Sequence, residues 1–332
     1  MRRTLLHSLV WLTAVLVSRC TLAGPLPLDL RGYADDAGAI SVVHEGASMD
    51  PYFAIQALLL AHDSGLEVDP HVQRLVAWLL PRQKPDGTFD RFCRGVLQRW
   101  EPCQRADADD SLLAMWSRLL ELTPAALAAH PGWQRSHAAA RAALDRLYQP
   151  SRGIYMVSHL SLHGLFMDNL EVWWLRAQAS GPGAKVEAGA LAKAIHSTFW
   201  NPVDGRFLVS TQLEHRSVKP GFYPDAVAQI FPLLVGFPHL PQPAAAYYRS
   251  WMREHRREWL AQGATDYPWG LIAVIALQHG DTESAACWIA RSARLRHGAR
   301  WSVTDETAYQ ILLSRGLTAR APAANCLDRG PA

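Results

Sequence analysis

The sequence predicts an all-α protein whose helices form a two-layer ring. Helix-length segments follow one another from residue 52 to residue 313, and segments that are apolar on nearly every face alternate with segments that carry one apolar stripe. Helices of an inner layer are covered on all sides, whereas helices of an outer layer face water, so this alternation is typical of a two-layer helical ring. A linear stack of helical pairs would alternate too, so periodicity alone does not close the ring.

The segments divide into two sets. Inner helices are expected at 52–62, 109–122, 164–179, 223–235, 266–279 and 305–313, and outer helices at 71–81, 133–148, 186–199, 244–260 and 283–295. Six helical hairpins would require one more helix than these segments supply, and the sequence does not place it.

Three connections between outer and inner helices repeat one pattern. Residues 83–89, 148–155 and 200–207 each contain a proline, then a glycine, then an aromatic residue. Proline and glycine favour a tight turn, and the aromatic residue is expected to return to the core in an extended segment. A repeated connection of this kind supports a repeated helical hairpin.

Composition and the first residues bound the compartment and the partners. Apolar residues make up 49% and charged residues 19% of the chain, and the net charge of +3 is too small to indicate a nucleic-acid partner. Arg2 and Arg3 precede an apolar run at 5–17, and small residues at 21–23 suit a signal peptidase. We therefore expect a signal peptide at 1–23 and one domain at 24–330, exported to the periplasm or the medium. No later segment is apolar for long enough to span a membrane.

Four cysteines remain after removal of the leader, and an even number in an exported chain indicates disulfides. They are Cys93, Cys103, Cys287 and Cys326. Of the three possible pairings we favour Cys93–Cys103, which would staple a loop ahead of an inner helix, and Cys287–Cys326, which would hold the C-terminal tail. No spacing of cysteine and histidine indicates zinc, and no metal or cofactor is predicted.

Acidic residues gather at the starts of the inner helices. They are Asp107, Asp109 and Asp110 at one start, and Asp168, Asp225, Asp266, Asp305 and Glu306 at others. An aspartate at a helix start caps backbone N–H groups and contributes about 1 kcal/mol, which accounts for most of this series. Three carboxylates within residues 107–110 exceed what one helix terminus can use, so this stretch predicts a functional cleft.

Three short segments in order resemble glycoside hydrolase family 8, within the six-hairpin glycosidases. Residues 43–48 contain Glu45 before Gly46, as in the family's acid segment; Asp107-Ala108-Asp109 is similar to its Asp-x-Asp motif; and residues 223–226 are similar to its Tyr-Asp-Ala segment, with Pro224 inserted. The resemblance implies an (α/α)6 toroid in which Glu45 is the general acid and Asp225 the base. It also implies that Asp107 or Asp109 binds the distorted sugar.

The residue types suit cleavage of a polysaccharide such as a β-1,4-glucan. Inverting hydrolysis requires one carboxylic acid and one carboxylate about 6.5–9.5 Å apart, and carboxylates at the mouths of different inner helices can meet across an axial cleft. Aromatic rings stack on sugar faces. The residues expected to bind the saccharide are Trp100, Asp168, Tyr223, Tyr267 and Trp269.

Two other functions fit parts of the sequence. The stretch 107–111 is also a DxDD[ST] string, and 83–89 resembles a QxxDG-aromatic repeat; together they resemble class II terpene cyclases, in which Asp109 would protonate an alkene. The expected export of the chain disfavours a cytosolic prenyl diphosphate as substrate. The second alternative is an exported toroid without activity, which binds a polysaccharide or a protein and whose acids only cap helices.

Overall fold

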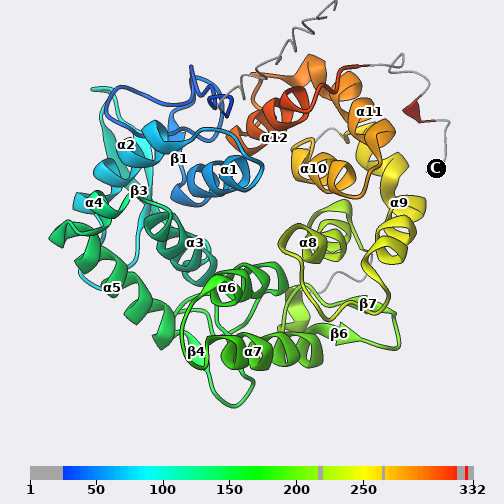
Figure 1. Ribbon diagram of the computed structural model, residues 1–332, viewed down its shortest axis with the longest axis horizontal. Helices are drawn as coiled ribbons and strands as arrows, with labels where there is room; N and C mark the ends of the chain where they lie inside the picture. The colour runs from blue at the N-terminus through cyan, green and yellow to red at the C-terminus, as the bar shows by residue number, and fades with distance from the viewer. Residues whose placement is uncertain (1–24, 216–219, 264–265, 320–325, 328–332) are drawn as a thin grey trace, which may run out of the picture.

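Six inner and five outer helices form a closed two-layer ring in the part of the chain that the structure describes (Figure 1). This computed structural model describes residues 25–215, 220–263, 266–319 and 326–327, so the expected signal peptide at 1–23 lies outside the described residues. The inner helices are α1 (Pro51–Asp63), α3 (Asp109–Glu121), α6 (Phe166–Gln178), α8 (Val227–Val235), α10 (Gly270–Gln278) and α12 (Val303–Ser314). The outer helices are α2 (Asp69–Leu79), α5 (Pro131–Arg146), α7 (Ala184–Phe199), α9 (Ala244–Ala261) and α11 (Thr282–Ser292), and α4 (Ala125–Ala128) is one further turn.

Each inner helix packs against the next one, and α12 packs against α1, which closes the ring. The predicted toroid is therefore confirmed, and its eleven helices lie where the periodicity placed them. Two inner helices begin four residues later than predicted, at Val227 and at Gly270. Pro224 and Pro268 explain the delay, because a proline pushes the residue before it out of the helical conformation.

The predicted turns between outer and inner helices are present as short β-hairpins. β4 (Tyr148–Gln149) pairs with β5 (Ile154–Tyr155), and β6 (Trp200–Asn201) pairs with β7 (Arg206–Phe207). The third connection is larger: β1 (Ser48–Met49), β2 (Asp90–Arg94) and β3 (Trp100–Arg105) form an antiparallel sheet. In each connection the aromatic residue, Phe89, Tyr155 or Phe207, is buried in the core as expected.

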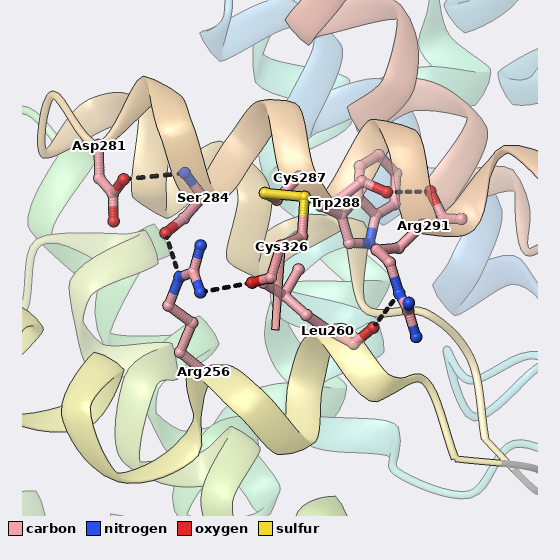
Figure 2. The surroundings of a disulfide bond; sticks show 9 residues. Arg256, Leu260, Asp281, Ser284, Cys287, Trp288, Arg291 and Cys326 are labelled. Atoms are coloured by element: carbon pink, nitrogen blue, oxygen red, sulfur yellow. Dashed lines mark hydrogen bonds between the residues drawn. A yellow bond between two sulfur atoms is a disulfide. The ribbon is translucent and has the colours of Figure 1, made fainter. Parts of the chain in front are cut away.

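Both predicted disulfides are present. Cys93–Cys103 joins β2 to β3, and Cys287–Cys326 joins α11 to the C-terminal residues. Figure 2 shows that Arg256 of α9 lies beside the second disulfide, where it donates to Ser284 Oγ and to the carbonyl oxygen of Cys326, each over 2.8 Å. The C-terminal residues are thereby tied to two outer helices at once.

The expected twelfth helix does not occur among the described residues. Instead, the irregular segment 25–47 packs against α12. Val303 N donates to the carbonyl oxygen of Val42, and the Gln310 side chain exchanges hydrogen bonds with the backbone of Asp29. Leu30 and Ile40 of this segment are buried in the core. An extended strap therefore covers part of the ring where the helical series ends.

The core lies between the two layers and contains large aromatic side chains that also make hydrogen bonds. Trp116 of α3 donates to Ser136 Oγ of α5 over 3.0 Å, and Trp251 of α9 donates to the carbonyl oxygen of Ala226 over 2.8 Å. These bonds link an inner helix or its start to an outer helix. No helix in the described part of the chain is long and apolar enough to cross a membrane.

Candidate active site

A cavity of about 360 Å³ opens where the inner helices begin, and we call it the mouth cavity. All inner helices run in the same direction along the ring axis because each alternates with an outer return helix. Their N-terminal ends, and the loops before them, therefore meet on one face. The size falls within the range of about 300–1,000 Å³ typical of small-molecule sites.

Five aspartates from five different connections line the mouth cavity. They are Asp50, Asp107, Asp168, Asp266 and Asp305. Each lies at, just before or in the first turn of an inner helix, so part of the predicted series of acids at helix starts meets in one shared site. The five side chains nevertheless have very different surroundings, and these surroundings decide what each can do.

Asp168, in the first turn of α6, is a buried acid. Burial, and then the nearby charge of Asp107, raise the pKa of Asp168 to about 7. Its Oδ2 atom is buried and has no hydrogen-bond partner in the described part of the chain. A carboxyl group that is protonated close to neutral pH and faces a cavity can act as a proton donor.

Asp107 lies at the cavity entrance, where 77% of its side chain is exposed. Arg91 of β2 donates through Nη2 to Asp107 Oδ2, and its Nε lies 2.6 Å from Asp50 Oδ2. Arg91 therefore joins the loop before α3 to the N-cap of α1. Burial raises the pKa of Asp50, and the charge of Arg91 acts in the opposite direction.

Asp266 and Asp305 lie on the other side of the cavity and are fully hydrogen-bonded. Asp305 forms a capping box with Ser302 and also accepts from Gly270 N over 2.7 Å. Burial raises the pKa of Asp305 to about 6, against the effect of these donors. Asp266 Oδ2 accepts from Trp269 Nε1 over 2.9 Å.

Aromatic rings form a wall of the mouth cavity. Tyr223 and Trp269 stack, with their ring centroids 4.9 Å apart and their planes inclined by 25°. The ring centroids of Tyr267 and Phe53 lie 5.8 Å apart. All four residues line the cavity. Tyr223 is exposed at the entrance, so the stacked pair offers a flat surface to an incoming ligand.

The structure brings together part of the predicted site. Asp107, Asp168, Tyr223, Tyr267 and Trp269 all line the mouth cavity. These residues come from loops that are far apart in the chain, so their meeting is a property of the ring and not of the local sequence.

Four other predicted residues do not line it. Glu45 is exposed on the loop before β1, and Asp225 is buried with Oδ2 accepting from Gly221 N over 3.0 Å. Asp109 is absent from the cavity lining, and burial raises its pKa against the charges of Lys84 and His159. Trp100 Nε1 donates to Asp35 Oδ2. The terpene-cyclase alternative relies on Asp109, which does not line this cavity.

Sequence reasoning did not assign Asp50, Tyr52, Arg91 or Asp305 to the site. Asp50 and Asp305 gave a signal, since both are acids at the start of an inner helix. Arg91 gave none, because an arginine in a short β-strand is ordinary. No group of three or more potential metal ligands occurs among the described residues.

Solved structures with the same architecture cover most of the chain. A GH63 mannosylglycerate hydrolase from Thermus thermophilus is 13% identical, with a TM-score of 0.50 over 87% of this chain and 98% of that chain. An α-amylase from Clostridium perfringens is 10% identical (TM-score 0.54; 85% and 93%). A cold-adapted family 8 xylanase is 9% identical (TM-score 0.53; 84% and 84%).

No family model and no curated protein matches the sequence. At identities near 10% the structural likenesses establish the fold and leave the activity open. The chain thus has the six-hairpin (α/α)6 toroid fold found in glycosidases of several families, at sequence identities of only 9–13% to these structures.

Proposed function

We propose that this protein is an exported glycoside hydrolase that cleaves a polysaccharide, such as a β-1,4-glucan, within the mouth cavity. Asp168 is the general acid and Asp107 the general base. One observation carries the proposal: Asp168 and Asp107 line the same cavity, where Asp168 is buried and its pKa is raised to about 7, while the side chain of Asp107 is exposed. Hydrolysis of a glycoside requires such a pair, one group protonated and one ionised.

The other groups of the cavity suit the same reaction. Tyr223 and Trp269 offer a stacked surface for a sugar ring, while Arg91 fixes Asp107 by an ion pair. Asp107 at the entrance can contact water, whereas Asp168 lies deeper and is shielded from it. We expect inversion at the anomeric carbon, which proton NMR of the first product anomer would test.

The decisive experiment compares cavity acids with sequence-predicted acids outside the cavity. The processed protein is incubated with β-glucans, chitosan and uronate polymers, and new reducing ends are assayed. Asp168→Asn and Asp107→Asn should each lower kcat by about 10²–10⁴-fold, the usual contribution of a general acid or base. Glu45→Gln and Asp225→Asn are matched controls that should retain activity. Loss of activity in the controls, with activity kept in Asp168→Asn, would return the assignment to Glu45 and Asp225.

A non-catalytic saccharide-binding toroid is the second candidate. The ion pairs of Arg91 with both Asp50 and Asp107 favour it, because they supply a structural reason for these acids. This candidate predicts that the protein binds a glycan of the panel and releases no reducing ends. It also predicts that Asp168→Asn leaves the binding affinity unchanged.

A further inference from the structure

A second cavity lies behind the mouth cavity on the axis of the ring. It measures about 70 Å³ and shares three lining residues, Gln56, Phe231 and Leu271, with the mouth cavity. Its rim includes Asp63 and Gln278, which are exposed at the C-terminal ends of α1 and α10. This lower cavity therefore opens on the face of the ring opposite the mouth.

Glu171 lies between the two cavities. It follows Asp168 by one turn of α6, is buried, and lines the lower cavity but not the mouth cavity. Its Oε1 atom accepts from the Tyr52 hydroxyl over 2.9 Å and from Gln56 Nε2 over 3.4 Å. Tyr52 lines the mouth cavity, so Glu171 can affect a ligand there only through its neighbours.

The contacts continue across the floor of the mouth cavity. Gln56 Nε2 also donates to the Tyr52 oxygen over 2.9 Å, and Thr304 of α12 donates to Gln56 Oε1 over 3.3 Å. Three inner helices, α6, α1 and α12, are thus joined by side-chain hydrogen bonds directly below the cavity. The Tyr52 hydroxyl both donates and accepts a hydrogen bond in this network.

The second oxygen of Glu171 indicates what fills the lower cavity. Oε2 is buried and has no hydrogen-bond partner among the described residues. A buried polar atom without a partner is costly, and ordered water usually supplies the missing hydrogen bond. A polar site needs only about 10–15 Å³ to hold one water molecule, so the lower cavity has room for water.

Glu171 changes its protonation state at a pH close to neutral. Burial, and then the charge of Asp168, raise the pKa of Glu171 to about 8. The other titratable groups near it are Tyr52 on α1, Asp110 on α3 and Tyr223 before α8, and Asp63 lies at the rim of the lower cavity. At pH 7 Glu171 is therefore mostly neutral, and glutamine is a close replacement for it.

We propose that Glu171 is a positioning residue, whose carboxyl group fixes Tyr52 at the floor of the mouth cavity while water in the lower cavity hydrates its second oxygen. The proposal rests on the proposed function, because Tyr52 lines the cavity in which the saccharide is expected. It assigns the lower cavity to water and not to a second ligand.

The first test measures binding of cellohexaose by calorimetry at pH 7. Glu171→Gln should bind within about twofold of wild type, whereas Glu171→Leu and Tyr52→Phe should each weaken binding about tenfold, the scale of one hydrogen bond. The double variant should be no weaker than either single variant, since both remove the same contact. Glu187→Leu on the exposed side of α7 controls for the change of residue type. Additive losses, or a Gln variant as weak as the Leu variant, would overturn the proposal.

The second test needs neither a ligand nor activity. Tyrosine labelled with ¹³C at Cζ is followed by NMR between pH 6 and pH 9.5, with Tyr52→Phe used to assign the Tyr52 signal. In wild type this signal should shift with an apparent pKa near 8, and in Glu171→Gln that shift should vanish. A shift that persists in Glu171→Gln refutes the coupling. If the pH-dependent shift is present in wild type and absent in Glu171→Gln, but no polymer is cleaved or bound, then the positioning of Tyr52 by Glu171 is supported and the proposed function fails.

Discussion

Acids at the starts of the inner helices have opposite surroundings on the two sides of the mouth cavity. On the α10–α12 side, the carboxylates of Asp305 and Glu306 both accept hydrogen bonds. On the α3–α6 side, Asp110, Asp168 and Glu171 are buried with oxygens that lack partners within the described chain. An acidic residue in the first two turns of an inner helix therefore has a structural role on one side, and on the other side a role that packing does not explain.

Glu306 is a buried acid whose two carboxylate oxygens both accept hydrogen bonds. It accepts from Arg296 through both oxygens, over 2.9 and 2.7 Å, and also from Trp301 Nε1 and Gln310 Nε2. Its pKa is lowered even though burial acts to raise it. These bonds join the loop before α12 to its first two turns, so Glu306 stabilises the fold.

Asp110 shows the opposite case. It is fully buried at the start of α3, and burial raises its pKa well above the ordinary value, with further contributions from Asp168 and Glu171. Neither carboxyl oxygen makes a hydrogen bond in the described chain, although backbone amides close by lower the pKa somewhat. Three such acids on two packed helices cost stability, and functional sites are where such a cost is commonly found.

The largest expected effect is on the satisfied side. Glu306→Leu leaves the Arg296 guanidinium and the Trp301 N–H without their acceptor, and breaking a buried ion pair costs about 3–5 kcal/mol. Because the Arg296 side chain is partly exposed and can be hydrated after the change, we expect a loss in the free energy of unfolding at the lower end of that range. Urea denaturation at pH 7 measures the free energy of unfolding. A loss smaller than that of a surface change such as Glu254→Leu would contradict the comparison.

On the α3–α6 side we expect the opposite effect: replacing a buried acid should raise the free energy of unfolding at pH 8. The folded pKa of Asp110 lies above the unfolded value of 3.8, so the folded state holds a proton that the unfolded chain releases. Stability should therefore fall as pH rises above about 4, by about 1.4 kcal/mol for each pH unit that separates the unfolded pKa from the folded pKa. Asp168 and Glu171 add to this loss up to pH values near 7 and 8.

Asp110→Asn removes one of these ionisations. We expect the variant to be more stable than wild type at pH 8 and no more stable at pH 4.5, as measured by urea denaturation at both values. Glu254→Gln, on an exposed position of α9, is the matched control and should change neither value. A variant that is less stable at pH 8 would show that Asp110 makes a favourable contact as an ion.

The difference between the two sides also explains what the sequence could and could not predict. Helix order, the turns and the cysteines available for disulfides follow from periodicity and residue type, which are local, whereas closure of the ring is implied by the resemblance to a known family. Whether an acid is satisfied depends on side chains that arrive from distant segments, such as Arg296 for Glu306 or Arg91 for Asp107. Glu171 gave a usable signal, since an acid in the middle of a helix that is apolar on most faces needs a reason.

Glu45 illustrates what a short motif leaves undetermined. Its position before the first inner helix matches the acid segment of family 8, yet its backbone has a φ of 51° and its N–H donates to the carbonyl oxygen of Gly32. This local turn leaves the side chain exposed outside the lining of the mouth cavity. A motif fixes the order of residues along the chain, whereas the direction of a side chain depends on the backbone conformation at that residue.

The smallest expected effect concerns Asp266, a partnered acid that lines the cavity. Its Oδ2 accepts a hydrogen bond from Trp269 Nε1, and Trp269 stacks on Tyr223. We therefore expect Asp266 to orient the aromatic wall and to take no part in proton transfer. Asp266→Asn keeps one acceptor oxygen, which should weaken cellohexaose binding by no more than about threefold, whereas Asp266→Ala should weaken it by about tenfold. Calorimetry of both variants at one pH separates the two possible roles. A positioning role predicts the smaller loss of affinity in the Asn variant, but a role as an ionised acid would make the Asn variant as damaging as the Ala variant. The second result would place Asp266 with Asp168 among the chemically active acids and would end the division between the two sides of the cavity.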